Sequence, residues 1–426
     1  MVFINAAALH AFYIFYTPTW ERQHDVIGFR NGKGIGQAAL IEYLLENGHF
    51  PDFDPTKRWG FFQPLLHHII AALALKINLL RGMNYDSACE NLQLLTFVYS
   101  LVFIFYGFRI FMLMGLEGRR LMASEVLLAL HPVFILLSGS VNNDMLSHMF
   151  FIMAVFHILR WQKGDRLKDL LLTALFIGLS MMSKLSGVLI APAVAFLMLR
   201  KLYTDIREKG NIPARIGSFA LFGAIVFPLG LFFPLRNYLL FKVPLDYMPE
   251  VGEELTGHSV LSRIFDIRTN TPYACMVKNG NPYDEFNVFL LLIKTGLTGE
   301  YDFGADNPLI TPFAWILFIS GCLLFVTVAI LFIYVFFGRK LIKDVPIRVF
   351  WVILILTGIL FMVRLMFKAP NFSSGDIRYI AWIIVGAAML PGLYLQEKGG
   401  GTALFLEALT GAFALSSAAV YILLGL

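Results

Sequence analysis

Residues 312–337 read PFAWILFISGCLLFVTVAILFIYVFF and contain no charged side chain. A helix of about 20 apolar residues is long enough to cross the hydrocarbon core of a bilayer. Similar runs recur at residues 92–114, 121–137, 145–161, 170–182, 187–199, 216–234, 349–367, 380–395 and 403–424, after a shorter first segment at 2–16. The pattern predicts an all-α polytopic membrane protein, a bundle of about 11 transmembrane helices.

The composition excludes an ordinary soluble protein. Of the 426 residues, 58% are hydrophobic and only 15% are charged, whereas a soluble domain has about 25% charged residues. The net charge of +5 comes from basic residues in short loops, which indicates membrane orientation rather than nucleic-acid binding. The three cysteines lack the spacing of a zinc site or a disulfide framework. We expect a single transmembrane domain over residues 1–426.

The basic loops predict the orientation of this domain. Placing them all in the cytoplasm satisfies the positive-inside rule; they are residues 117–120, 163–168, 200–215, 338–348 and 396–398. This arrangement requires that residues 64–80 do not cross the membrane completely, so we predict a juxtamembrane or re-entrant helix there. The alternative is that this segment is an ordinary span and that the orientation of the following loops is reversed.

The predicted orientation places the distinctive polar segments on one side. The first outer loop, residues 18–91, is then extracytoplasmic and carries juxtamembrane helices, one of them at residues 35–45. A second, long outer loop covers residues 236–310. Long loops are usually functional, so we expect the active site on the extracytoplasmic face of what is most simply a plasma-membrane protein.

Two acidic residues on this side are the candidate catalytic groups. Asp25, next to His24, follows the first apolar segment, where a carboxylate is able to act as a general base or to help bind a divalent metal. Asp144 follows Asn143 in a short turn between two apolar runs. The bland interpretations are a solvated acid at a helix end for Asp25 and ordinary turn or cap residues for Asn142, Asn143 and Asp144.

The remaining candidates are polar or cationic residues on the same side, which we assign to substrate binding. Cations near the membrane are costly and tend to mark a site or an ion pair, and arginine suits a lipid phosphate. For Arg378 the alternative is pairing with Asp376 or snorkelling to the headgroups. Metal ligation is the weaker interpretation because paired histidines at i, i+4 are absent. These candidates are His24, Gln63, His67, Asn143, Arg236, Asn237, Lys294, Asp376, Arg378 and Tyr379.

Several of these segments, in order, resemble GT-C glycosyltransferases of the family 39 type, which includes protein O-mannosyltransferases and bacterial aminoarabinose transferases. The resemblance spans most of the chain, although each motif alone is weak. It departs from the family where His24-Asp25 supplies one acid instead of two, and where Gln63-Pro64-Leu65 replaces His-Pro-Pro. The matching stretches are His24-Asp25, residues 62–68, 130–144, 184–187, 234–238 and 376–379.

The resemblance implies a GT-C-like bundle and a polyprenyl-phosphate sugar as donor, with a protein, lipid or glycan as acceptor. Asp25 would be the base of an inverting hexosyltransferase, Asp144 a supporting acid, and Arg236 and Arg378 would hold the donor phosphate. No cofactor is implied with certainty, and the residues leave a divalent metal open. Two alternatives remain: a transporter or flippase for lipids or small molecules, and a GT-C homologue whose site has decayed.

Overall fold

The computed structural model describes residues 1–21, 28–29, 36–245, 247–249, 257–274, 285–338, 341–370, 373–396 and 399–426. Within these ranges the chain forms helices and no β-strand, which confirms the predicted all-α class. The helices are α1 (Val2–Tyr16), α2 (Gln37–Asn47), η1 (Pro55–Lys57), α3 (Leu66–Leu80), α4 (Tyr85–Glu90), α5 (Gln93–Leu113), α6 (Gly118–Ala129), α7 (Pro132–Gly139), α8 (Asp144–Gly164), α9 (Leu167–Ser183), η2 (Leu185–Ile190), α10 (Ala191–Arg207), α11 (Ile212–Phe241), α12 (Val260–Phe265), α13 (Val288–Thr298), α14 (Ile310–Phe337), α15 (Val345–Lys368), η3 (Ser373–Gly375), η4 (Ile377–Ile380), α16 (Ile383–Leu395) and α17 (Gly401–Leu423).

Six helical segments are long and apolar enough to cross a membrane, or eight if each of two bent pairs forms one span. The bends lie between α6 and α7, at 46°, and between the η3–η4 segment and α16, at 61°. The protein is therefore an integral membrane protein, but this count does not confirm eleven crossings. Three of the expected spans, α1, α8 and α9, fall outside it. α1 and α9 have only 15 and 17 residues, and α8 carries Asp144, His148 and His157.

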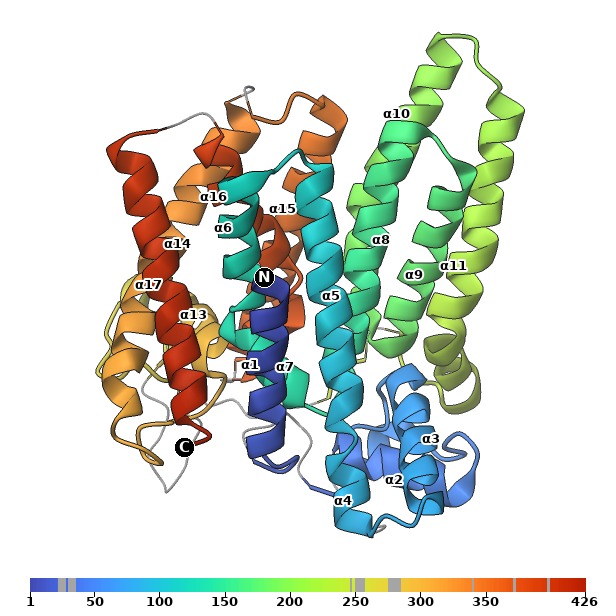
Figure 1. Cartoon of the computed structure of the whole chain (residues 1–426). Helices are drawn as coiled ribbons and strands as arrows, with labels where there is room; N and C mark the ends of the chain where they lie inside the picture. The colour runs from blue at the N-terminus through green and yellow to red at the C-terminus, as the bar shows by residue number, and fades with distance from the viewer. Residues whose placement is uncertain are drawn as a thin grey trace.

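The helices run roughly along one axis and form an elongated bundle (Figure 1). The small helices α2, α3 and α4 group together at the bottom of this view, which we call the lower end of the bundle. With 15 residues, α3 is about 22 Å long, shorter than the hydrocarbon core of about 30 Å. The juxtamembrane or re-entrant character of residues 64–80 stays a prediction, because α1 has the same length.

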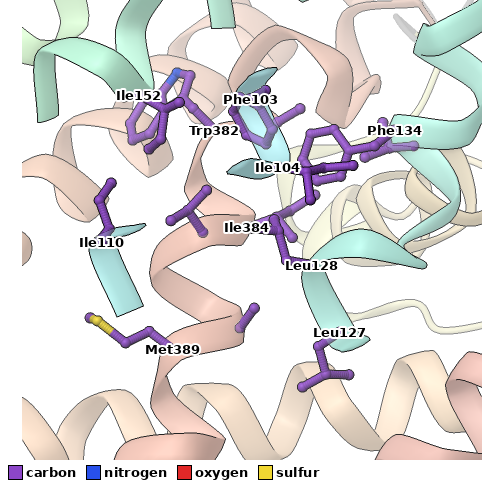
Figure 2. Close-up of a cluster of buried hydrophobic side chains, with 14 of the residues drawn as sticks. Phe103, Ile104, Ile110, Leu127, Leu128, Phe134, Ile152, Trp382, Ile384 and Met389 are labelled. Carbon is purple, nitrogen blue, oxygen red and sulfur yellow. The ribbon is translucent and has the colours of Figure 1, made fainter. Parts of the chain in front are cut away.

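The core is held together by interlocking apolar side chains from helices far apart in sequence. Figure 2 shows Phe103 and Ile104 of α5 beside Leu128 of α6 and Trp382, which directly precedes α16. Gly107 makes this packing close, because a Cβ atom built there would lie 2.3 Å from the Leu128 side chain. Small residues let membrane helices approach in this way.

The same device joins α9 to α11. A Cβ atom at Gly178 would lie 2.7 Å from Leu229, and one at Gly230 would lie 2.7 Å from Met181. The two helices therefore pack closely against each other. The loop between α10 and α11 lies at the opposite end of the bundle (Figure 1).

Candidate active site

The turn between α7 and α8 is built by its own asparagine. The side-chain oxygen of Asn142 accepts a hydrogen bond from the backbone N–H of Asp144 at 3.0 Å, an arrangement in which Asn commonly stabilises turns. Asp144 then begins α8 and is only 1% exposed. The turn interpretation is thus confirmed for Asn142, while the Asp144 carboxylate points into the protein.

Two cations surround the buried Asp144 carboxylate. Lys184 directly follows the last residue of α9, and its Nζ donates to Asp144 Oδ1. Arg378 Nη1 lies 3.9 Å from Asp144 Oδ2. A buried carboxylate is strongly unfavourable unless it is paired, so these two cations account for its place inside the bundle.

Arg378 is held from three sides. Asp376 Oδ2 lies 3.2 Å from Arg378 Nε, and Asp376 Oδ1 accepts from the Arg378 backbone N–H at 2.8 Å. On the other side, His148 Nε2 donates to the Arg378 carbonyl at 2.7 Å. Because Asp144 and His148 are spaced i, i+4, they lie on the same face of α8. One face of α8 therefore positions both the side chain and the backbone of Arg378.

An aromatic ring completes the arrangement. The Tyr379 ring centroid lies 4.7 Å from Lys184 Nζ and 5.1 Å from the Arg378 guanidinium carbon, distances typical of cation–π contacts. We call Asp144, His148, Lys184, Asp376, Arg378 and Tyr379 the Asp144 cluster. Its two carboxylates and two fixed cations balance in formal charge.

Gln63, in the segment before α3, reaches this cluster. The side-chain oxygen of Gln63 accepts a hydrogen bond from Asn143 Nδ2 at 3.1 Å. Asn143 Nδ2 also donates to the Ser183 carbonyl at 2.8 Å. Ser183 directly precedes Lys184. Two predicted residues, Gln63 and Asn143, are thus brought to the edge of the cluster.

The adjacent histidines of α3 point in different directions, as expected from helix geometry. His68 Nε2 hydrogen-bonds the Gln37 side chain of α2. The ring of His67 is fully buried and lies 6.2 Å, between centroids, from the ring of Tyr99. His67 and not His68 therefore turns away from the α2 contact.

Arg236 and Asn237 lie near the C-terminal end of α11, at the lower end of the bundle. Arg236 donates to the Asn237 side chain at 3.1 Å and to the carbonyl of Pro51. An open, mostly apolar hollow on α11 includes Arg236 in its lining, together with Phe227, Pro228, Phe232, Leu235, Leu239 and Leu240. Arg236 is the cation of this hollow, separate from the contacts of the Asp144 cluster.

Lys294 of α13 was predicted to bind substrate, but in the structure it forms an ion pair within the protein. Its amine lies 2.9 Å from Glu285 Oε2, and both side chains are buried. The next residue, Thr295, accepts from the Ile377 backbone N–H at 3.2 Å and so supports the segment that carries Arg378. The role visible for α13 is therefore support of η4.

Two predicted site residues, His24 and Asp25, lie outside the residues that the structure describes. Two residues of the Asp144 cluster, His148 and Lys184, were not among the predicted ones. The i, i+4 spacing of His148 from Asp144 is a signal for the first of them, whereas nothing in the local sequence marks Glu285. Across the described ranges, no group of three or more His, Cys, Asp or Glu side chains is placed to hold a metal ion.

Comparison with known proteins supports the resemblance in the first half of the chain. Residues 63–228 match the model of the family described as dolichyl-phosphate-mannose-protein mannosyltransferase, which confirms the resemblance to GT-C glycosyltransferases over this segment. The match includes Gln63, Asn143, Asp144 and Lys184 but ends before the residues that carry Arg378. No curated protein matches the chain.

One solved structure that this chain matches is "Archaeal oligosaccharyltransferase AglB from Archaeoglobus fulgidus in complex with an inhibitory peptide and a dolichol-phosphate". The sequence identity is 13% and the TM-score 0.46. The alignment covers 100% of this chain and 55% of that chain. This chain thus spans about half the length of that protein.

Proposed function

We propose that the protein is a membrane glycosyltransferase that moves a hexose from a polyprenyl-phosphate donor to an acceptor hydroxyl on the extracytoplasmic face. The observation that carries this proposal is the Asp144 cluster, which holds an arginine and a lysine inside a membrane bundle. The family match over residues 63–228 supports the class of reaction. A protein is the acceptor that the name of that family favours.

The two cations suit the leaving group of this reaction. When the bond between the anomeric carbon and the phosphate oxygen breaks, the electron pair stays with the lipid phosphate and adds a negative charge to it. Cations that are already in place stabilise such developing charge. Asp144 and Asp376 neutralise Lys184 and Arg378 in the structure, so the donor phosphate competes with these two carboxylates for the two cations.

Asp25 is our candidate for the base. The acceptor oxygen attacks the anomeric carbon from the face opposite the phosphate, and its proton passes to the Asp25 carboxylate. This single displacement inverts the configuration at the anomeric carbon. The apolar hollow on α11 suits the prenyl tail of a lipid donor.

The test is a transfer assay with the full chain reconstituted in liposomes. Labelled polyprenyl-phosphate hexose is supplied with and without an acceptor polypeptide, to wild type, Asp25→Asn and Glu117→Gln. Glu117 is the control acid, because it lies before α6 and its side chain makes no cap hydrogen bond. We expect transfer by wild type and Glu117→Gln and at least a hundredfold loss in Asp25→Asn, about 2.7 kcal/mol of barrier.

Each other outcome has a definite meaning. Equal transfer by all three proteins would remove Asp25 from the reaction. If the transferred sugar has the same anomeric configuration in the product as in the donor, inversion is refuted. Absence of transfer with every donor and acceptor tested would overturn the glycosyltransferase proposal and favour transport or a non-catalytic homologue.

A further inference from the structure

The short helix α12, in the long outer loop, buries its charged residue and exposes its apolar residues, the opposite of a helix on the surface of a soluble protein. Its arginine, Arg263, is only 3% exposed, whereas Leu261 and Phe265 are 68% and 73% exposed. These two apolar residues are spaced i, i+4 and share one face. Val260 and Ile267 add to the same exposed apolar surface. We call Val260, Leu261, Phe265 and Ile267 the α12 patch.

The buried arginine attaches α12 to the end of a membrane helix. Arg263 Nη2 donates to the Met366 carbonyl at 2.9 Å, and its guanidinium carbon lies 4.8 Å from the centroid of the Phe367 ring. Asn287 holds the other side, donating from Nδ2 to the Ile264 carbonyl at 3.1 Å. α12 is therefore fixed against the last turn of α15 and the start of α13.

The α12 patch continues a surface that faces lipid. On α15 the exposed residues Leu356, Leu360 and Val363 form a stripe at helical spacing, and Phe367 is the next position of that stripe. Met366 lies two residues before the end of α15, a helix apolar and long enough to span the membrane. This places α12 at the depth where α15 leaves the hydrocarbon core.

We propose that α12 lies in the membrane interface, with the α12 patch inserted among the acyl chains of the leaflet at the lower end of the bundle. A surface helix with apolar residues towards the lipid and a cation turned away from it binds membranes in this way. The long outer loop is then tethered to the bilayer beside α15. The proposal is independent of which reaction the protein catalyses.

The test places single cysteines in the otherwise native chain, at Leu261→Cys and Phe265→Cys, with Arg268→Cys as the matched control. The Arg268 side chain is 77% exposed and bonded to Asp266. In lipid nanodiscs we measure labelling by a charged maleimide, resolved peptide by peptide so that the native cysteines do not interfere. We expect cysteines at residues 261 and 265 to be labelled at least about tenfold more slowly than a cysteine at residue 268. The free energy of burying an apolar surface keeps the α12 patch in the acyl chains for most of the time, where the charged maleimide does not reach it.

A second measurement distinguishes a patch covered by lipid from a patch covered by a protein surface. Bimane attached at residue 265 should be quenched by doxyl-labelled phosphatidylcholine and protected from aqueous iodide, with the opposite result at residue 268. Equal labelling of the three sites, or quenching at residue 265 by iodide alone, would overturn the proposal. Slow labelling without doxyl quenching would also overturn it, since a protein surface would then cover the patch.

Discussion

The pairing of Lys184 with Asp144 leads to a measurable coupling between two residues 40 positions apart in sequence. Breaking a buried ion pair from one side leaves an uncompensated charge and costs about 3–5 kcal/mol. Two features reduce this cost here, because the Lys184 side chain is 14% exposed and Asp144 keeps Arg378 at 3.9 Å. We therefore expect Lys184→Met to lower the free energy of unfolding by about 2–4 kcal/mol.

The double-mutant cycle is the decisive part. Asp144→Asn alone leaves the Lys184 amine beside a neutral amide and should also destabilise the protein. In Lys184→Met/Asp144→Asn neither charge remains, so the double variant should be more stable than the sum of the single effects predicts. We expect a coupling energy of at least about 1.5 kcal/mol, within the range measured for residues in contact.

The assay is equilibrium unfolding of the purified protein in mixed micelles with increasing sodium dodecyl sulfate, followed by far-ultraviolet circular dichroism. Arg119→Met is the control, since Arg119 pairs with Glu407 on an exposed surface and should change the stability by less than about 1 kcal/mol. A coupling energy near zero, with both single variants folded, would refute the pairing of Lys184 with Asp144.

Three further predictions follow from other contacts. Arg378→Lys should reduce sugar transfer in liposomes by at least about tenfold, because one ammonium group cannot reach both carboxylates that the guanidinium faces; unchanged transfer would contradict this role. Glu90→Ala should lower the stability by about 1–3 kcal/mol in the same micelle titration, since Glu90 accepts from the buried Thr19 backbone N–H at 3.1 Å; an unchanged titration midpoint would show that another acceptor replaces it. Hydrogen bonds from Arg215 lower the pKa of Asp165, in the loop between α8 and α9, so the stabilisation is complete above the usual pKa of about 3.9 and is lost as the pH falls through the lowered value. Arg215→Met should flatten the stability profile in this acidic range, and a profile parallel to that of wild type would argue against the contact.

Local sequence determined the class of this protein. Uninterrupted apolar runs predicted membrane helices, because the free energy of inserting a segment is close to a sum over its own residues. The same local logic predicted the turn before Asp144, whereas the side of the membrane that the polar groups face and the juxtamembrane character of residues 64–80 stay predictions. It failed to fix the number of crossings, since segments such as α8 carry polar groups that only neighbouring helices compensate.

The site itself was predicted only in part. Asp144, Asp376, Arg378 and Tyr379 were each predicted as site residues. The alternative interpretation, pairing of Arg378 with Asp376, is confirmed, whereas the pairing of Asp144 with Lys184 and Arg378 was not predicted. Nothing near Lys294 in the sequence revealed that it forms an ion pair with Glu285. Arg236 lines a hollow on α11 and does not belong to the Asp144 cluster. Asp25, the residue on which the proposed chemistry depends most, remains a prediction.

Only the tertiary structure decided which charges meet. His148 and Arg378 are joined by a hydrogen bond although they are 230 residues apart, and their contact depends on how α8 packs against the segment before α16. The strength of an ion pair depends on its distance and on its burial, and both are properties of the folded bundle. The sequence could therefore show that charged residues occur near the membrane, whereas packing determined that a lysine and an arginine share one buried carboxylate.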